Sequence, residues 1–204
     1  MTNLIKYLVL ISFSILLIAC NNTLQLTDSS SSNNKVEASI AISTAADSTI
    51  TPYRDSMKLK MDEVLNETLV DLEVGSPEGL LGDFVTDLTF DKVRNTVSNA
   101  PDFCILNNGG LRTPVLKGDI TRGKIFELMP FENEVVIIEI SADKMIDLIE
   151  YIRSKSLVTN SRKAGVPVSN FRMMMSNGEV TNVMINNRQY NKNKTYRVVT
   201  TDYL

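Results

Sequence analysis

The chain has 204 residues with a formal net charge of −3, and 43% of its residues are hydrophobic. This is enough apolar material for one folded domain, and the charge balance gives no reason to expect nucleic acid or an acidic membrane surface as a partner. The sequence contains no histidine. Histidine is the usual general base near neutral pH and the commonest zinc ligand. A histidine-based triad is therefore excluded within these residues and a two-metal hydrolase site is not expected there, although carboxylates alone can bind Mg²⁺ or Ca²⁺.

Residues 1–19 have the pattern of an export leader. Lys6 places a positive charge near the N-terminus, an apolar run extends from Tyr7 to Ala19, and Cys20 follows directly. The run is too short for a stable membrane-spanning helix, and its end resembles a bacterial lipobox, in which the cysteine is acylated and the peptide is cut just before it. We therefore expect lipidation at Cys20 and anchoring in the bacterial cell envelope, outside the cytoplasm. The alternative is an uncleaved N-terminal helix with an incidental cysteine.

Residues 20–35 are polar and low in complexity, which predicts a flexible tether, and the folded domain is predicted to span residues 36–204. Alternation of apolar with polar or small residues from Val36 to Ile42 predicts a half-buried strand at the start of that domain. The other cysteine, Cys104, lies in a short apolar run and is interpreted as a buried strand residue; the alternative is a reactive thiol.

Three helices are predicted from apolar residues at helical spacing, and all three are interpreted as core elements. The first has Thr51 as its cap and Pro52 in its first turn, and its apolar stripe reaches Leu65. The second runs from about residue 77 to 90. The third follows Ser141, which is a possible cap.

Strands are predicted between and after these helices, at residues 103–106, 135–140, 171–175, 180–185 and 196–201. The run at 135–140 is rich in β-branched residues and suits a buried strand. Asn177-Gly178 is typical of a hairpin turn between the third and fourth strands. Helices mixed with partly antiparallel strands predict an α+β fold, with helices packed on a mixed sheet.

The sharpest local motif is Asn-Asn-Gly-Gly-Leu-Arg at residues 107–112, which directly follows a predicted apolar strand. Gly109 and Gly110 allow backbone N–H groups to approach a ligand closely. The side-chain amide of Asn107 has both a hydrogen-bond donor and an acceptor. The planar guanidinium of Arg112 has paired N–H donors that suit phosphate or ribose oxygens. Taken alone, the pattern favours a simpler interpretation, a glycine turn with a surface arginine.

A second motif presents an aromatic ring at the entry to a strand. Phe131 directly follows Pro130, which holds it stiffly, so that the ring can stack on a flat base. Asn133, two residues later, can hydrogen-bond the edge of that base. The alternative is that Phe131 belongs to the core.

Together these motifs resemble the C-terminal domain of 5′-nucleotidases. The resemblance rests on Asn-x-Gly-Gly-hydrophobic-Arg at 107–112, Gly-Asp-Ile-Thr at 118–121 and Pro-Phe-x-Asn at 130–133, in that order. Further similar segments, in consistent order, are residues 50–53, 78–87, 194–198 and 201–204. The likeness therefore covers about residues 36–204.

In that family the C-terminal domain recognises the nucleotide, while a separate N-terminal metallophosphatase domain hydrolyses the phosphate ester. The resemblance implies that Phe131 stacks on the base, Asn133 reads its edge, and Asn107 and Arg112 hold the ribose and phosphate side, on a loop shaped by the two glycines. It also implies that this chain holds no cofactor. The divalent metal is expected in a partner metallophosphatase, on a separate subunit.

The sequence departs from the family pattern in two places. Ser76-Pro77 stands where members often carry an arginine just before the glutamate matched by Glu78, which puts one phosphate contact in doubt. The sequence also stops at Leu204, before the family's Gly-Gly-Asp-Gly and its second stacking aromatic. Stacking is worth about 1–3 kcal/mol per base, so losing one face is expected to weaken binding by about one to two decades.

The leading hypothesis is a lipid-anchored nucleotide-recognition domain of a 5′-nucleotidase that is not catalytic alone. The alternative is a lipid-anchored binding or scaffold module that has lost its affinity for nucleotides. A third hypothesis, a hydrolase that uses Asp83 or Asp87, is disfavoured because both lie on a predicted helix, where charged residues usually face solvent.

Overall fold

The computed structural model describes residues 5, 29–33, 35, 43–159, 161 and 163–204. The chain divides into two compact units, Met1–Thr44 and Ala45–Leu204. Cys20 and the strand predicted at residues 36–42 lie outside the described residues. Within the ranges that the structure describes, no helix is both long and apolar enough to cross a membrane.

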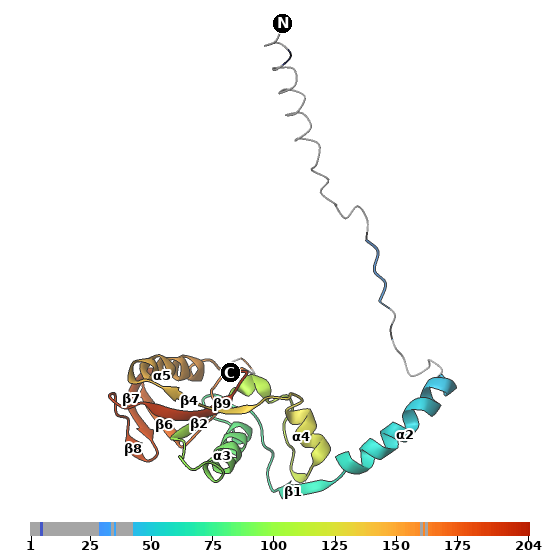
Figure 1. Ribbon diagram of the computed structural model, residues 1–204, viewed down its shortest axis with the longest axis horizontal. Coiled ribbons are helices and arrows are strands. Elements are labelled where there is room, and N and C mark those ends of the chain that lie inside the picture. The colour runs from blue at the N-terminus through green and yellow to red at the C-terminus, as the bar shows by residue number, and fades with distance from the viewer. Residues whose placement is uncertain (1–4, 6–28, 34, 36–42, 160, 162) are drawn as a thin grey trace. The chain divides into compact units, whose positions relative to one another are not determined.

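Helices and strands mix throughout the described chain (Figure 1). The helices are α2 (Thr44–Met61), α3 (Leu80–Arg94), α4 (Arg122–Leu128) and α5 (Ala142–Ser156), and a short 3-10 helix, η1, covers Asn108–Gly110. The strands are β1 (Val64–Thr68), β2 (Phe103–Ile105), β3 (Gly118–Thr121), β4 (Val135–Ile140), β5 (Val168–Ser169), β6 (Phe171–Ser176), β7 (Glu179–Ile185), β8 (Arg188–Gln189) and β9 (Tyr196–Thr201). The predicted α+β class is confirmed.

The strands form a central four-stranded sheet and two smaller sheets. In the central sheet the order is β4-β9-β2-β5, and β9 runs parallel to β2 while the other neighbours are antiparallel. β6, β7 and β8 form one small sheet, and β1 with β3 the other. The predicted hairpin turn joins β6 to β7, with Asn177 at φ 52° and Gly178 at φ 81°. The last predicted strand does not continue that hairpin but pairs inside the central sheet.

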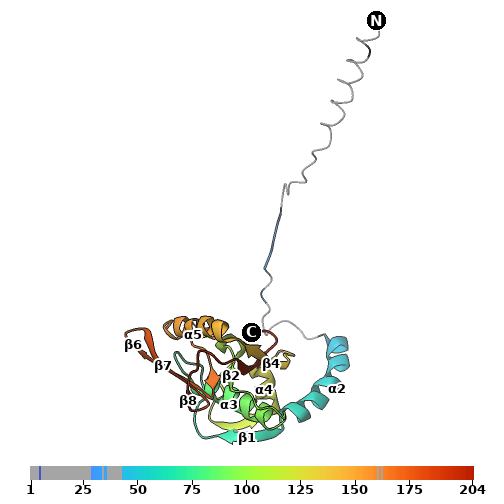
Figure 2. The same cartoon turned by 60° about the vertical axis from the view of Figure 1, so that its left-hand side comes forward.

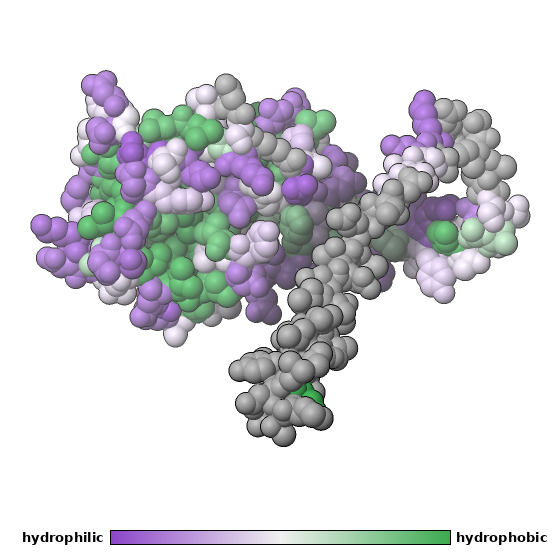
Figure 3. Space-filling view, turned by 90° about the horizontal axis from the view of Figure 1, so that it is seen from above, coloured by the Kyte–Doolittle hydropathy of each residue, from purple (hydrophilic) through white to green (hydrophobic). Residues whose placement is uncertain are grey.

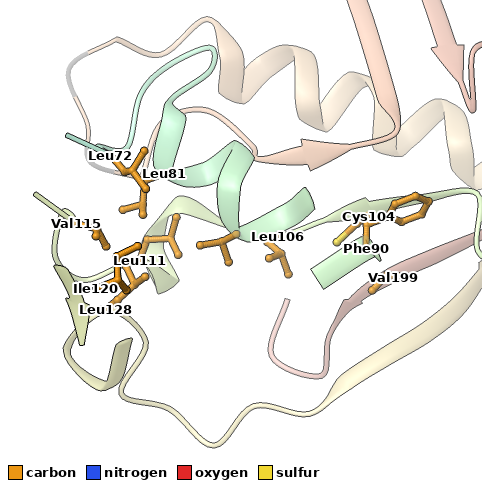
Figure 4. Packing of buried hydrophobic residues seen from close by; sticks show 11 residues of the cluster. Leu72, Leu81, Phe90, Cys104, Leu106, Leu111, Val115, Ile120, Leu128 and Val199 are labelled. Carbon is orange, nitrogen blue, oxygen red and sulfur yellow. The ribbon is translucent and has the colours of Figure 1, made fainter. Parts of the chain in front are cut away.

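Two hydrophobic clusters cover the two faces of the central sheet. Successive side chains of a strand point to opposite faces, so Phe103 packs in one cluster with Met145 of α5, while Cys104 packs in the other with Leu81 of α3. The second of these clusters is drawn in Figure 4. α5 and α3 accordingly lie on opposite sides of the sheet in both ribbon views (Figures 1 and 2). Hydrophobic residues also reach the surface, where they lie among hydrophilic ones (Figure 3).

The prediction for the first helix is wrong in its start and in its burial. α2 begins at Thr44 and contains Pro52 in its interior, and none of its residues is buried. A proline costs the helix one backbone hydrogen bond, but its fixed φ remains compatible with helical geometry. Val64 and Leu65 belong to β1 and pair with the region of Thr121, because the chain leaves the helix after Met61. The apolar stripe of this segment is therefore not part of the core.

The other predicted helices and strands are largely confirmed, with one difference in burial. α3 buries Leu81 and Val85, and α5 buries Met145 and Ile152, as core helices do. β4 has the predicted bounds but is an edge strand with no fully buried residue, because β9 flanks it on one side only. The β-branched run at residues 135–140 therefore predicted the position of the strand correctly, but the prediction that this strand is buried is wrong.

Candidate functional site

The loop after β2 is shaped by the side chain of Asn107. This residue is the N-cap of η1, and its Oδ1 accepts a hydrogen bond from the backbone N–H of Gly110 at 2.6 Å. A Cβ on Gly110 would lie only 3.1 Å from that same oxygen, so a glycine permits the close approach. Asn107 thus fixes the loop with its oxygen. Within the described ranges its Nδ2 makes no hydrogen bond, so this donor is the part of the amide that a ligand can use.

Arg112 is held at the end of the same loop. Its backbone N–H donates to the carbonyl of Leu128 at 2.8 Å, which ties the loop to the last residue of α4. Its Nη1 donates weakly to the carbonyl of Gly109 at 3.5 Å. The guanidinium is exposed and lies over the glycine loop, where a ligand phosphate can reach it.

Asn108, between these residues, is buried and holds three segments together. Its Nδ2 donates to the carbonyl of Ala164 at 2.6 Å and to that of Gly75 at 3.1 Å. These partners lie before α3 and after α5, far from η1 in the sequence. The side chain therefore fixes the loop against both flanking segments, a role that the sequence motif did not reveal.

Phe131 and Asn133 reach the site through α4. Thr121 caps α4 by accepting a hydrogen bond from the N–H of Lys124, and the helix ends at Leu128, three residues before the aromatic ring. Phe131 is 50% exposed and belongs to neither hydrophobic cluster, so it is not a core residue. Asn133 is half-buried at the entry to β4.

All six residues predicted to bind the nucleotide line a single pocket of about 420 Å³. These residues are Asn107, Gly109, Gly110, Arg112, Phe131 and Asn133. The structure brings together segments that lie on either side of α4 in the sequence. Their role in ligand binding stays a prediction.

Eight further residues line this pocket that were not predicted to bind the nucleotide: Leu106, Leu111, Met129, Tyr151, Lys155, Lys163, Thr201 and Tyr203. Two of them are aromatic residues that line the pocket together with Phe131. Tyr203, 80% exposed, follows β9, and Tyr151 projects from α5. Tyr151 and Lys155 are four residues apart and share one helix face, but the helical spacing does not say which pocket that face meets.

The charged side chains that line the pocket are all positive among the described residues. Arg112, Lys155 and Lys163 line it, and no aspartate or glutamate among the described residues does so. The chain as a whole has 24 acidic and 21 basic residues. A pocket with cations, aromatic rings and amide groups, but no carboxylate, suits a ligand with a flat ring and an anionic group.

A larger cavity of about 510 Å³ lies between α3 and β4, away from these residues. Its lining is mainly aliphatic, with Lys92 as its single charged residue among those described. Its two threonines, Thr89 and Thr96, already donate their hydroxyl groups to the backbone carbonyls of Val85 and Lys92. The smaller, mixed pocket is therefore the better candidate for a functional site.

Carboxylates and the thiol lie elsewhere. Burial, followed by the charges of Glu78 and Asp87, raises the pKa of Asp83, but none of these residues lines the pocket. Burial also raises the pKa of the Cys104 thiol to about 12, with Asp87 as a second cause, so the predicted buried strand cysteine is confirmed. Among the described residues no group of three histidine, cysteine or acidic side chains is placed to hold a metal ion.

Known proteins are similar to this chain in sequence and in fold. The sequence profile of the family described as "5'-nucleotidase, C-terminal domain" matches residues 64–204. A 5'-nucleotidase of Vibrio parahaemolyticus is 29% identical over 102 residues, which cover 50% of this chain and 18% of that protein. The chain thus spans about a fifth of the length of this relative.

Solved structures show the same fold. A 5'-nucleotidase precursor from Thermus thermophilus has a TM-score of 0.59 and 25% identity, over 78% of this chain and 33% of the other. The NAD nucleotidase of Haemophilus influenzae has a TM-score of 0.58 and 19% identity, over 79% of this chain and 32% of the other. With the family match over more than half of its residues, this chain belongs to the 5′-nucleotidase C-terminal domain family.

Proposed function

We propose that this domain binds a nucleotide in the pocket behind the glycine loop. The observation that carries the proposal is the pocket itself, in which Arg112, Phe131 and the amide of Asn107 meet without a carboxylate among the described residues. Arg112 neutralises the phosphate, and the Nδ2 of Asn107 donates to the ribose side. Phe131 stacks on the base, and Asn133 hydrogen-bonds its edge.

The second face of the base is covered by a tyrosine. Tyr203 and Tyr151 both line the pocket with Phe131, and each ring has a flat face on which a base can stack. Tyr203 is the better candidate because it is the most exposed of the three rings, so the least contact with the protein is lost when it turns onto a ligand. A base held on both faces gains about 1–3 kcal/mol from each ring.

Hydrolysis of the phosphate ester is proposed to use a metallophosphatase on a separate subunit. The support is chemical. These 204 residues contain no histidine, and no aspartate or glutamate among the described residues lines the pocket. A two-metal site depends on such ligands. The domain would then hold the nucleotide while the partner supplies the metal ions and the activated water. Turnover of AMP by the purified chain with divalent metal ions, retained after contaminating phosphatase is removed, would refute this division of labour.

Calorimetric titration with AMP tests the binding proposal. Phe131→Ala is expected to weaken binding by about 5- to 100-fold, from the loss of about 1–3 kcal/mol of stacking. Phe126→Ala is the matched control, because Phe126 is similarly exposed, at 56%, but does not line the pocket. Arg112→Ala is expected to weaken binding of AMP more than binding of adenosine, and Arg172→Ala, on β6 outside the pocket, to change neither.

Either of two binding results would overturn the proposal. If neither purine nor pyrimidine nucleotides bind at millimolar concentration, or if Arg112→Ala and Phe131→Ala bind AMP as the control variants do, the pocket is not a nucleotide site. The chain would then fit the alternative function, a binding or scaffold module without affinity for nucleotides.

We also propose that Cys20 carries a lipid and anchors the protein in the bacterial cell envelope. The support is the leader pattern that ends at Ala19. Acyl chains contribute about 0.8 kcal/mol per buried CH₂, so two or three chains are enough for stable anchoring. In detergent phase partitioning, the natural protein is expected in the detergent phase and Cys20→Ser in the aqueous phase. Equal partitioning of the two would contradict the proposal.

A further inference from the structure

The aliphatic cavity of about 510 Å³ lies beside an outer edge of the central sheet. α3 contributes Leu88, Lys92 and Val93 to its lining, and β4 contributes Val135 and Ile137. Large apolar side chains are exposed here, Leu88 at 60% and Val135 at 51%. Apolar residues exposed around one hollow are typical of a surface that another polypeptide covers. This cavity and the outer edge of β4 together are called the edge groove below.

The outer edge of β4 carries backbone groups that can pair with a further strand. Among the described residues β9 is the only strand that pairs with β4. The N–H and the carbonyl of Glu134, just before β4, both bond to Asp202, just after β9. Backbone groups alternate in direction along a strand, so those of Val135, Ile137 and Glu139 point away from β9. The edge thus presents the N–H and carbonyl groups of three residues to the outside.

The sequence of β4 favours pairing at this edge. Five of its six residues are β-branched and apolar, in the order Val-Val-Ile-Ile-Glu-Ile. Exposed edges are usually protected by proline, by lysine or by a bulge. β4 contains none of these, and its register with β9 is continuous. Glu139 is its only charged residue, and 71% of that side chain is exposed.

The charged groups at the edge groove have opposite signs. Lys92 is the only charged residue that lines the cavity among the described residues, and it forms no ion pair with any of them. Glu139 lies on the same face of β4 as Val135 and Ile137, because side chains alternate along a strand. Its ion pair with Nε of Arg197 is 4.0 Å long, which is at the limit for such a contact. Both groups can therefore pair with an opposite charge from outside the chain.

We propose that a second copy of this chain covers the edge groove, with the two β4 strands paired antiparallel about a two-fold axis at Ile137. A strand that fits must supply outward backbone groups, apolar side chains and a carboxylate for Lys92, and β4 itself supplies all three. Pairing Ile137 with its own copy places Glu139 of the second copy opposite Val135, beside Lys92. The two-fold axis repeats this ion pair at the other end of the paired strands.

The resulting interface is small and does not involve the candidate nucleotide pocket, since no residue of α3 or β4 lines that pocket. The outward-facing residues of the two copies exchange about six backbone hydrogen bonds. Apolar side chains meet on both faces, Ile137 opposite its copy on one face and Val136 opposite Ile138 on the other. Interfaces below about 1,200 Å² are typical of weak or transient complexes, so we expect a dissociation constant of about 10 µM.

A protective role for Glu139 is a definite alternative. A charge on an exposed edge can keep that edge from pairing with other chains. If this is its role, Glu139→Gln strengthens association, because the obstacle is removed. If it pairs with Lys92 of a second copy, Glu139→Gln weakens association. The direction of the change separates the two roles.

The experiment is sedimentation equilibrium of the full chain over about 1 to 200 µM, a range that brackets the expected dissociation constant. Cys20→Ser is present throughout, so that no lipid contributes to association. The variants are Glu139→Gln, Lys92→Glu, Glu139→Lys and the last two combined. The matched control is Lys192→Glu with Glu127→Lys, which reverses the same charges at exposed positions outside the edge groove. Far-UV circular dichroism verifies that each variant is folded.

The parent chain is expected to form dimers. Lys92→Glu and Glu139→Lys are each expected to weaken dimerisation by about 10- to 100-fold, because two ion pairs become two contacts between like charges. The combined variant exchanges the two charges and is expected to dimerise as the parent does, and so is the control. A parent chain that stays monomeric at every concentration would refute the second copy as the occupant and leave the groove to another protein. Dimerisation that neither single reversal weakens, or that the combined variant does not restore, would refute it as well.

Cysteine pairs test the register directly. In the proposed pairing Val136 and Ile138 of the two copies are opposite, in a pair whose Cα atoms are about 4.5 Å apart, within the range of a disulfide. A mixture of Val136→Cys chains and Ile138→Cys chains is therefore expected to form disulfide-linked dimers faster than either chain alone. The remaining cysteine, Cys104, is buried and does not compete. A mixture that cross-links no faster than the separate chains would refute the proposed pairing.

Discussion

Replacement of Asn108 tests whether one buried amide holds the candidate site together. The side chain is 3% exposed, and its Nδ2 donates to the carbonyls of Ala164 and Gly75 at 2.6 and 3.1 Å. Asn108→Ala removes both donors and leaves two carbonyls without partners. We expect this variant to fold but to be less stable, because neither carbonyl has another donor in the described structure.

The magnitude follows from these contacts. A carbonyl that loses its partner in a buried place costs about 1–3 kcal/mol, and the partly buried carbonyl of Gly75 lies at the lower end of this range. The Oδ1 of Asn108 has no partner of its own, so its removal offsets about 1 kcal/mol. The expected net loss is about 2–3 kcal/mol, which lowers the Tm by about 4–12 °C for a domain of this size.

Asn108→Asp sharpens the test because it keeps the shape of the side chain. The aspartate has no donor for the two carbonyls and brings a negative charge to the same buried place, so we expect a loss larger than that of Asn108→Ala. Asn193→Ala is the matched control, since its side chain is exposed and makes no hydrogen bond within the described ranges. Here the expected change is below about 0.5 kcal/mol.

Urea unfolding of the full chain, followed by far-UV circular dichroism, measures these differences. The chain has no tryptophan, so indole fluorescence is not available as a probe. An Asn108→Ala variant as stable as Asn193→Ala would refute the reasoning. So would an Asn108→Asp variant more stable than Asn108→Ala, because the Nδ2 would then not be the group that matters.

Three other predictions concern the backbone, the thiol and the acidic cluster. Gly79→Ala is expected to prevent folding, because the added Cβ would overlap the backbone nitrogen of Gly75, and a backbone atom cannot move away as a flexible side chain can. A soluble, folded Gly79→Ala variant would contradict this. Cys104 is expected to resist alkylation at pH 8 in the native chain and to react in about 8 M urea, because burial raises its thiol pKa to about 12; rapid native labelling would disprove its burial. The pKa of Asp83 is raised in the fold by burial and by Glu78, so its charge opposes folding at neutral pH. Asp83→Asn should therefore increase stability at pH 7, and since the folded chain binds the proton more tightly than the unfolded chain, the gain should vanish as pH falls below the ordinary carboxylate range. A gain in urea midpoint that is independent of pH would contradict this cause.

The sequence by itself determined the class of the fold and the family. Alternation in the late strands, the Asn177-Gly178 turn and the stripe of Met145 and Ile152 on α5 are local patterns, and local patterns fix local structure. The order of short motifs along the chain sufficed to indicate the family, and Asn107, Arg112 and Phe131 do line one pocket. The predictions of strands, turn and helix succeeded because each depends on residues that are close in sequence, and the family was indicated because the order of motifs is itself a property of the sequence.

Only the tertiary structure determined which distant segments pack together and which residues that packing buries. The apolar stripe of α2 remains unburied, and β4 lies at a sheet edge, because burial depends on which neighbours the chain brings to each element. Lys155 and Tyr203 belong to the pocket only through the packing of α5 and β9 around the glycine loop. A sequence motif shows only how residues are spaced along one segment. A pocket forms where the surfaces of several segments come together, and the packing of the core determines which segments those are.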